Sequence, residues 1–129
     1  MLKKVKTYKF DVNTGKVQNK VDKKEEEPIF RVLDKLTTYL EFELVNYESG
    51  MLIELVIQTP GGEVKTLILS EVKTKQEYLV KKEVLVPVDI AGTYNCELRV
   101  SYNKLLATSD PFTYESKANI GGDNNGKEE

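Results

Sequence analysis

The fold is decided by the stretch Gly92-Thr93-Tyr94-Asn95-Cys96-Glu97-Leu98-Arg99-Val100-Ser101-Tyr102. Every second residue in its centre is apolar: Tyr94, Cys96, Leu98 and Val100. The residues between them are polar or charged. Successive side chains of a β-strand point to opposite faces of a sheet, so this alternation predicts a strand with one face in a core and the other in solvent.

Other segments with strand character flank this stretch on both sides. They cover residues 4–12, 29–33, 39–45, 51–59, 63–69, 77–88 and 105–114. The clearest turn sequences between them are Asn13-Thr14-Gly15, Pro60-Gly61-Gly62 and Asn103-Lys104. Seven or eight short strands at a spacing of roughly 8–12 residues are typical of an all-β sandwich or barrel. Pro111 cannot donate a hydrogen bond to a strand ladder, so we expect it at an edge or a bulge.

A corner motif narrows this prediction. Gly92, Tyr94 and Cys96 have the spacing found at the corner of immunoglobulin folds, where the glycine lets the chain turn and the tyrosine hydroxyl bonds to backbone across the corner. An ordinary glycine turn into a strand is the alternative. Cys96 is the single cysteine, so we interpret it as a small buried hydrophobic residue. The predicted fold class is an all-β, Ig-like antiparallel β-sandwich of seven or eight strands.

The charge is spread unevenly along the 129 residues, whose net charge is −2. Residues 1–24 hold eight lysines and two aspartates, which leaves a net charge of −8 on the remainder. We predict three regions: a basic N-terminal strand or arm with a charged linker (1–27), the Ig-like sandwich (28–116), and a polar flexible tail (117–129). The basic region is either a solvated arm or a segment that docks on an acidic neighbouring subunit.

The composition argues against catalysis. The chain has no histidine, which is the usual general base and metal ligand near neutral pH. Cys96 lacks an activating base, and the carboxylates of Glu41 and Glu43 on one strand face are expected in solvent beside lysines rather than as a catalytic pair. The carboxylates of Asp22, Glu25, Glu26 and Glu27 could bind calcium, but we interpret this run of acidic residues as a solvated loop. The sequence thus predicts no enzyme and no catalytic, cofactor-binding or metal site.

The chain also lacks the features of two other classes of binding protein. It has only two arginines, Arg31 and Arg99, so we predict no nucleic-acid binding. No apolar stretch approaches the roughly 18 residues of a membrane helix, so we predict no membrane insertion.

Three segments stand out: residues 5–12, residues 29–34 leading into Thr37-Thr38-Tyr39-Leu40-Glu41-Phe42-Glu43-Leu44, and residues 92–100 followed by Thr108-Ser109-Asp110-Pro111-Phe112-Thr113-Tyr114. In these segments the chain resembles the N-terminal domain of the phage baseplate upper protein family. The resemblance spans about residues 5–116. It implies a virion protein, made in the host cytoplasm, whose partners are other phage structural proteins. Family members continue into a neck or receptor-binding region, whereas this chain ends in a polar tail.

The function that follows is a structural component of the phage tail, a baseplate or adaptor protein that binds other virion proteins as a homo-oligomer or part of a larger assembly. One alternative is a capsid decoration or head-fibre Ig-like protein. Another is a carbohydrate-binding module, although such sites expose aromatic platforms and this chain has no tryptophan. The residues that make the interface are not identified by the sequence.

Overall fold

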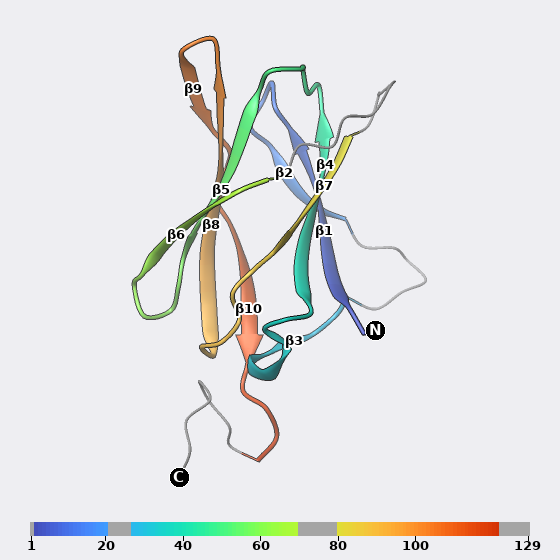
Figure 1. Ribbon diagram of the computed structural model, residues 1–129, viewed down its shortest axis with the longest axis vertical. Helices are drawn as coiled ribbons and strands as arrows, with labels where there is room; N and C mark the ends of the chain where they lie inside the picture. Colours follow the sequence, from blue (N-terminus) through green and yellow to red (C-terminus); the bar gives the residue numbers. More distant parts are fainter. Residues whose placement is uncertain (1, 21–26, 70–79, 122–129) are drawn as a thin grey trace.

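The computed structural model describes residues 2–20, 27–69 and 80–121, and almost all regular structure in these ranges is β-strand (Figure 1). The strands are β1 (Lys4–Asp11), β2 (Val17–Lys20), β3 (Phe30–Arg31), β4 (Thr38–Val45), β5 (Leu52–Gln58), β6 (Val64–Ile68), β7 (Val80–Leu85), β8 (Gly92–Tyr102), β9 (Leu105–Thr108) and β10 (Phe112–Lys117). A single 3-10 turn, η1 (Val32–Asp34), follows β3. No helix in the described part of the chain could cross a membrane.

The strands form two sheets packed face to face (Figure 1). Sheet A has the order β2-β1-β4-β7, and sheet B has the order β3-β10-β8-β5-β6, with β9 paired to β8. The decisive stretch, β8, lies inside sheet B between β10 and β5. The predicted all-β sandwich is therefore confirmed, and two of its details differ.

The first difference is strand direction. β1 runs parallel to β4 over its full length, from Lys4 opposite Thr38 to Asp11 opposite Val45. β3 also runs parallel to β10. The sheets are thus mixed and not purely antiparallel. Alternation defines the buried face of a strand but not the direction of its partner, and the 26 residues between β1 and β4 are long enough for the crossover that a parallel pair requires.

The second difference is strand number, which is ten among the described residues. Residues 17–20, expected within a polar linker, form β2 and pair antiparallel with β1. Three of the four residues of β2 are exposed, so the strand has no alternation to reveal it. The predicted segment 77–88 contains β7, and its residues 77–79 lie outside the described part of the chain.

The predicted last strand is divided into β9 and β10 by a bulge. Glu97 and Leu98 of β8 face three residues, Ser109, Asp110 and Pro111. The Leu98 N–H donates to the Ser109 hydroxyl at 2.8 Å, and the Ser109 N–H donates to the Leu98 carbonyl at 2.8 Å. The serine side chain therefore satisfies a backbone donor that the ladder would otherwise leave open. The expected position of Pro111, at a bulge, is confirmed.

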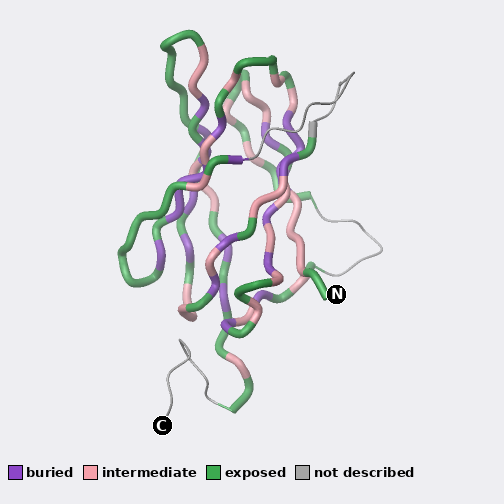
Figure 2. Tube along the Cα trace, viewed as in Figure 1, coloured by how far each residue is buried: buried purple, intermediate pink, exposed green. Residues whose placement is uncertain are grey.

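The core fills the space between the inner faces of the two sheets (Figure 2). The Tyr94 and Tyr114 rings stack with centroids 4.7 Å apart, and Tyr8 of sheet A packs on Phe112 of sheet B at 4.8 Å. The buried residues that form this core cluster are Tyr8, Phe10, Phe30, Leu40, Phe42, Leu44, Ile53, Leu55, Ile57, Leu69, Val86, Val88, Tyr94, Cys96, Leu98, Val100 and Tyr114. Two of them come from β1, so this basic strand is part of the sandwich.

The corner before β8 has the hydrogen bonds that the sequence motif predicted. The Tyr94 hydroxyl donates to the Ile90 carbonyl at 2.7 Å and accepts from the Ile90 N–H at 3.0 Å. Gly92 has a φ of +138°, which L side chains rarely adopt. These bonds identify a tyrosine corner and favour it over an ordinary glycine turn.

Gly92→Ala should destabilise the fold more than Gly62→Ala. A Cβ at position 92 would lie 2.9 Å from Cβ and Cγ of Pro60, whereas one at position 62 would meet no atom within 4 Å. Both positions have positive φ, so the strain is shared and the overlap belongs to position 92 alone. We expect the difference in unfolding free energy to be about 1–3 kcal/mol, measured by urea denaturation. Equal losses would contradict the close contact with Pro60.

Phe10→Ala tests whether β1 belongs to the core. Phe10 is 1 % exposed, and its truncation should cost about 3–5 kcal/mol of unfolding free energy. Lys9→Ala is the matched control, because Lys9 is the exposed neighbour on the same strand and should change stability by less than about 0.5 kcal/mol. A Phe10→Ala variant as stable as the control would mean that β1 does not pack on the sandwich in solution.

Candidate protein-interaction surface

The two glutamates considered as a catalytic pair lie on the outer face of sheet A and are engaged separately. Glu43 is only 4 % exposed, which corrects the expectation that it sits in solvent. Its carboxylate pairs with Lys20 of β2 at 2.6 Å and with Lys81 of the neighbouring β7 at 3.8 Å. Glu41 instead accepts a hydrogen bond from the Thr7 hydroxyl at 3.1 Å.

The candidate calcium ligands are represented in the structure by Glu27, since Asp22, Glu25 and Glu26 lie outside the described residues. Glu27 pairs with Lys6 at 2.7 Å and accepts a hydrogen bond from the Asn19 amide at 3.3 Å. The bond to Lys6 lowers the pKa of Glu27 below its ordinary value. Among the described residues, no three His, Cys, Asp or Glu side chains gather where they could hold a metal ion.

Cys96 is buried, as predicted, and burial raises its pKa to about 12. The thiolate is the reactive form of cysteine, and the raised pKa disfavours that form near neutral pH. Burial also raises the pKa values of the Tyr8, Tyr94 and Tyr114 hydroxyls above the ordinary value.

These raised pKa values predict a loss of stability in alkali. A raised pKa in the folded state means that folding favours the protonated form, so the stabilisation is complete below the unfolded pKa values of 9.0 for Cys and 10.0 for Tyr. It is lost as the pH rises above them. We expect the urea midpoint to be level near neutral pH and to fall above about pH 9, with the part of the tyrosinate absorbance that belongs to Tyr8, Tyr94 and Tyr114 appearing only as the chain unfolds. Ionisation of all tyrosines at ordinary pH with the fold intact would contradict this.

Four lysines of the basic N-terminal region pair with acidic groups of the same chain. The ion pairs are Lys3–Glu83 (2.6 Å), Lys4–Asp34 (2.6 Å), Lys6–Glu27 (2.7 Å) and Lys20–Glu43 (2.6 Å). They join β1 and β2 to the rest of the sandwich. Less positive charge is therefore available to an acidic neighbour than the sequence suggests.

Sheet B differs from sheet A in that several of its exposed side chains are aliphatic. Figure 2 shows exposed segments along β6 and along the β8–β9 hairpin. Exposed aliphatic side chains on these strands and on β5 are Leu52, Val64, Ile68, Leu105 and Leu106. Val64 and Ile68 lie on β6 at the edge of sheet B, and exposed apolar residues at a sheet edge are a common feature of protein interaction sites. The sequence predicts a strand over residues 63–69, but its pattern does not indicate that this strand lies at the edge of a sheet.

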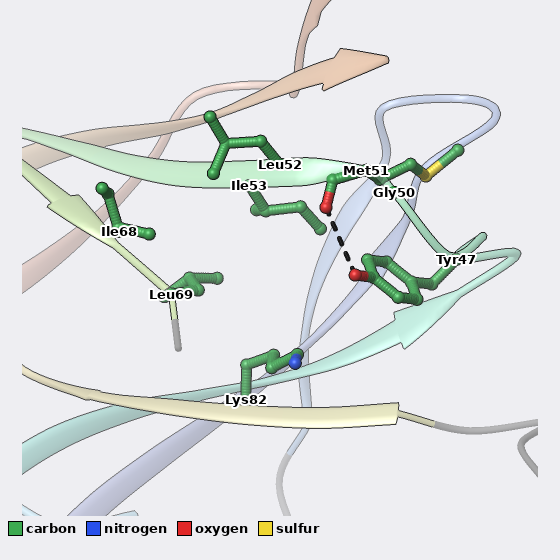
Figure 3. A pocket seen from close by; sticks show the side chains of 8 residues that line it. All are labelled: Tyr47, Gly50, Met51, Leu52, Ile53, Ile68, Leu69 and Lys82. Carbon is green, nitrogen blue, oxygen red and sulfur yellow. Dashed lines mark hydrogen bonds between the residues drawn. The ribbon is translucent and has the colours of Figure 1, made fainter. Parts of the chain in front are cut away.

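A cavity of about 290 Å³ lies at one end of the sandwich beside this region (Figure 3). Most of its lining is aliphatic, and Leu69 in its wall directly precedes residues 70–79, which are outside the described part. The Tyr47 hydroxyl bonds to the Met51 carbonyl at 3.2 Å. Lys82 is buried, with its ammonium 5.7 Å from the centre of the Tyr47 ring. The sequence analysis did not predict that Lys82 is buried, although Lys82 lies two residues from Val84 and so faces the same side of β7.

No family model matches the sequence, and no curated protein matches it. Among solved structures, the fold is similar to that of the N-terminal domain of phage TP901-1 ORF48, with a TM-score of 0.51. The match covers 91 % of this chain and 99 % of that one, at 10 % sequence identity. At this identity the similarity shows a common β-sandwich fold over nearly the whole of both chains.

Proposed function

We propose that the chain is a phage virion structural protein, a component or adaptor of the tail baseplate that binds other virion proteins. The observation that carries the proposal is the match of its fold, over almost its full length, to a domain of a phage protein. The sequence resemblance to the baseplate upper protein family points the same way, although it rests on different features. An immunoglobulin-like topology, supported by the tyrosine corner at Tyr94, is part of this proposal.

The geometry supports a binding role for the surface of sheet B. The carboxylates and the thiol weighed as catalytic groups are held in ion pairs, hydrogen bonds or the core. The exposed aliphatic residues of β5, β6 and β9 lie on one sheet and resemble the apolar part of a protein interface. Every described aromatic side chain is buried or half-buried, which disfavours a carbohydrate platform on this part of the chain.

Localisation on the particle tests this proposal. An antibody raised against the purified chain should label the distal end of the tail in particles of the phage whose genome encodes it, and mass spectrometry should detect the chain in separated tails. Labelling of heads would support the alternative role as a capsid decoration or head-fibre protein. Absence of the chain from purified particles would exclude both structural roles.

A further inference from the structure

The edges of the two sheets differ in what they offer to another chain. β2 and β7 border sheet A, β3 and β6 border sheet B, and β9 adds a short edge beside β8. An edge strand presents N–H and C=O groups without partners in its own sheet, and proteins usually guard such edges with charges, prolines, bulges or short length.

The unpaired backbone groups of β6 belong to Val64, Thr66 and Ile68. The Leu69 N–H donates to the Ile53 carbonyl at 3.1 Å, and the Thr59 N–H donates to the Glu63 carbonyl at 2.8 Å. Hydrogen-bonded pairs in an antiparallel ladder recur at every second residue. The odd-numbered residues of β6 therefore bond to β5, and the three even-numbered residues point their backbone groups away from the sheet.

None of these three residues is charged or a proline, so they lack the side chains that usually protect an edge strand from pairing. All are β-branched and uncharged, a side-chain type that favours strand pairing. Val64 is 60 % exposed and Ile68 is 63 % exposed. The charges next to them, Glu63 and Lys65, pair with each other at 3.4 Å, so the edge brings no net charge to a partner.

Two other edges are less suited than β6 to pairing with a copy of themselves. The Val86 N–H donates to the Thr38 carbonyl, so the outward backbone groups of β7 belong to Lys81, Glu83 and Leu85. An antiparallel pair of β7 strands centred on either charged residue would place like charges opposite each other. β3 has only two residues.

The remaining two edges are short and partly occupied. β2 has four residues, and its Asn19 side chain bonds to Glu27. The end of β9 is covered by the β1–β2 turn, where the Asp110 N–H donates to the Gly15 carbonyl at 2.8 Å. β6 is therefore the edge of the described structure that is best suited to self-pairing.

We infer that two copies of the chain associate through β6, antiparallel, about a two-fold axis at Thr66. This inference rests on the proposed function and names the surface and the partner for it. In this register each Thr66 pairs with the Thr66 of the other copy, and Val64 pairs with Ile68 in both directions. Lys65 lies opposite Leu67, so no like charges meet directly. The paired strands join the two B sheets into one, with the Val64–Ile68 contacts on its outer face.

A charge-complementation experiment on the full chain tests this register. Thr66 is exposed, so Thr66→Lys and Thr66→Glu should leave the thermal unfolding midpoint nearly unchanged. In sedimentation equilibrium the unaltered chain should form dimers as its concentration rises. Each variant alone should stay monomeric, because like charges face each other at the axis. An equal mixture of the two should dimerise again, since lysine then faces glutamate.

The control pair is Gln18→Lys and Gln18→Glu, at an exposed position of the β2 edge, which should leave dimerisation as in the unaltered chain. A chain that is monomeric at all concentrations, or Thr66 variants that dimerise singly, would overturn the inference. Neither result would affect the proposed virion role, which the particle labelling decides independently. Dimers restored by mixing, with no chain found on particles, would leave the β6 edge standing and remove the virion role.

Discussion

The parallel pairing of β1 with β4 is the constraint on which the rest of the structure depends. It holds eight residues of the N-terminal strand in register with the central strand of sheet A. The register brings Tyr8 and Phe10 level with Phe42 and Leu44, so the inner layer of sheet A is continuous. It also provides the strand against which β2 pairs, and β2 supplies a lysine that pairs with Glu43. A chain without β1 would therefore lose core, edge and ion pairs together.

The sequence predicted what depends on local chemistry. The alternation of β8 specified its buried face, and the spacing of Gly92 and Tyr94 specified a corner whose hydroxyl bonds were then observed. Pro111 was placed at a bulge because proline lacks the N–H that a ladder needs. The buried position of Cys96 followed from its inward phase and the lack of a second cysteine.

What the sequence could not predict depends on residues far apart in the chain. The direction of β1 relative to β4 leaves no trace in either segment. Glu43 has the outward phase that suggests solvent, but Lys20 and Lys81 of two other strands pair with it. Lys82 occupies an inward-facing position of β7 and is buried, but its charged side chain does not suggest a buried position. The edge position of β6 follows from the strand order of sheet B, because the pattern of residues 64–68 is compatible with both an edge strand and an interior strand.

The bonds around η1 place the start of β1 and the end of β10 at one pole of the sandwich. The Lys4 N–H donates to the Thr37 carbonyl, and the Arg31 guanidinium donates to the Ala118 carbonyl at 3.1 Å. Figure 1 shows the β8–β9 hairpin at the opposite pole. A tether joined at the start of β1 or at the end of β10 would leave from the same side of the sandwich. The sandwich can thus be fastened to a scaffold at one pole and keep its β8–β9 hairpin clear of the attachment.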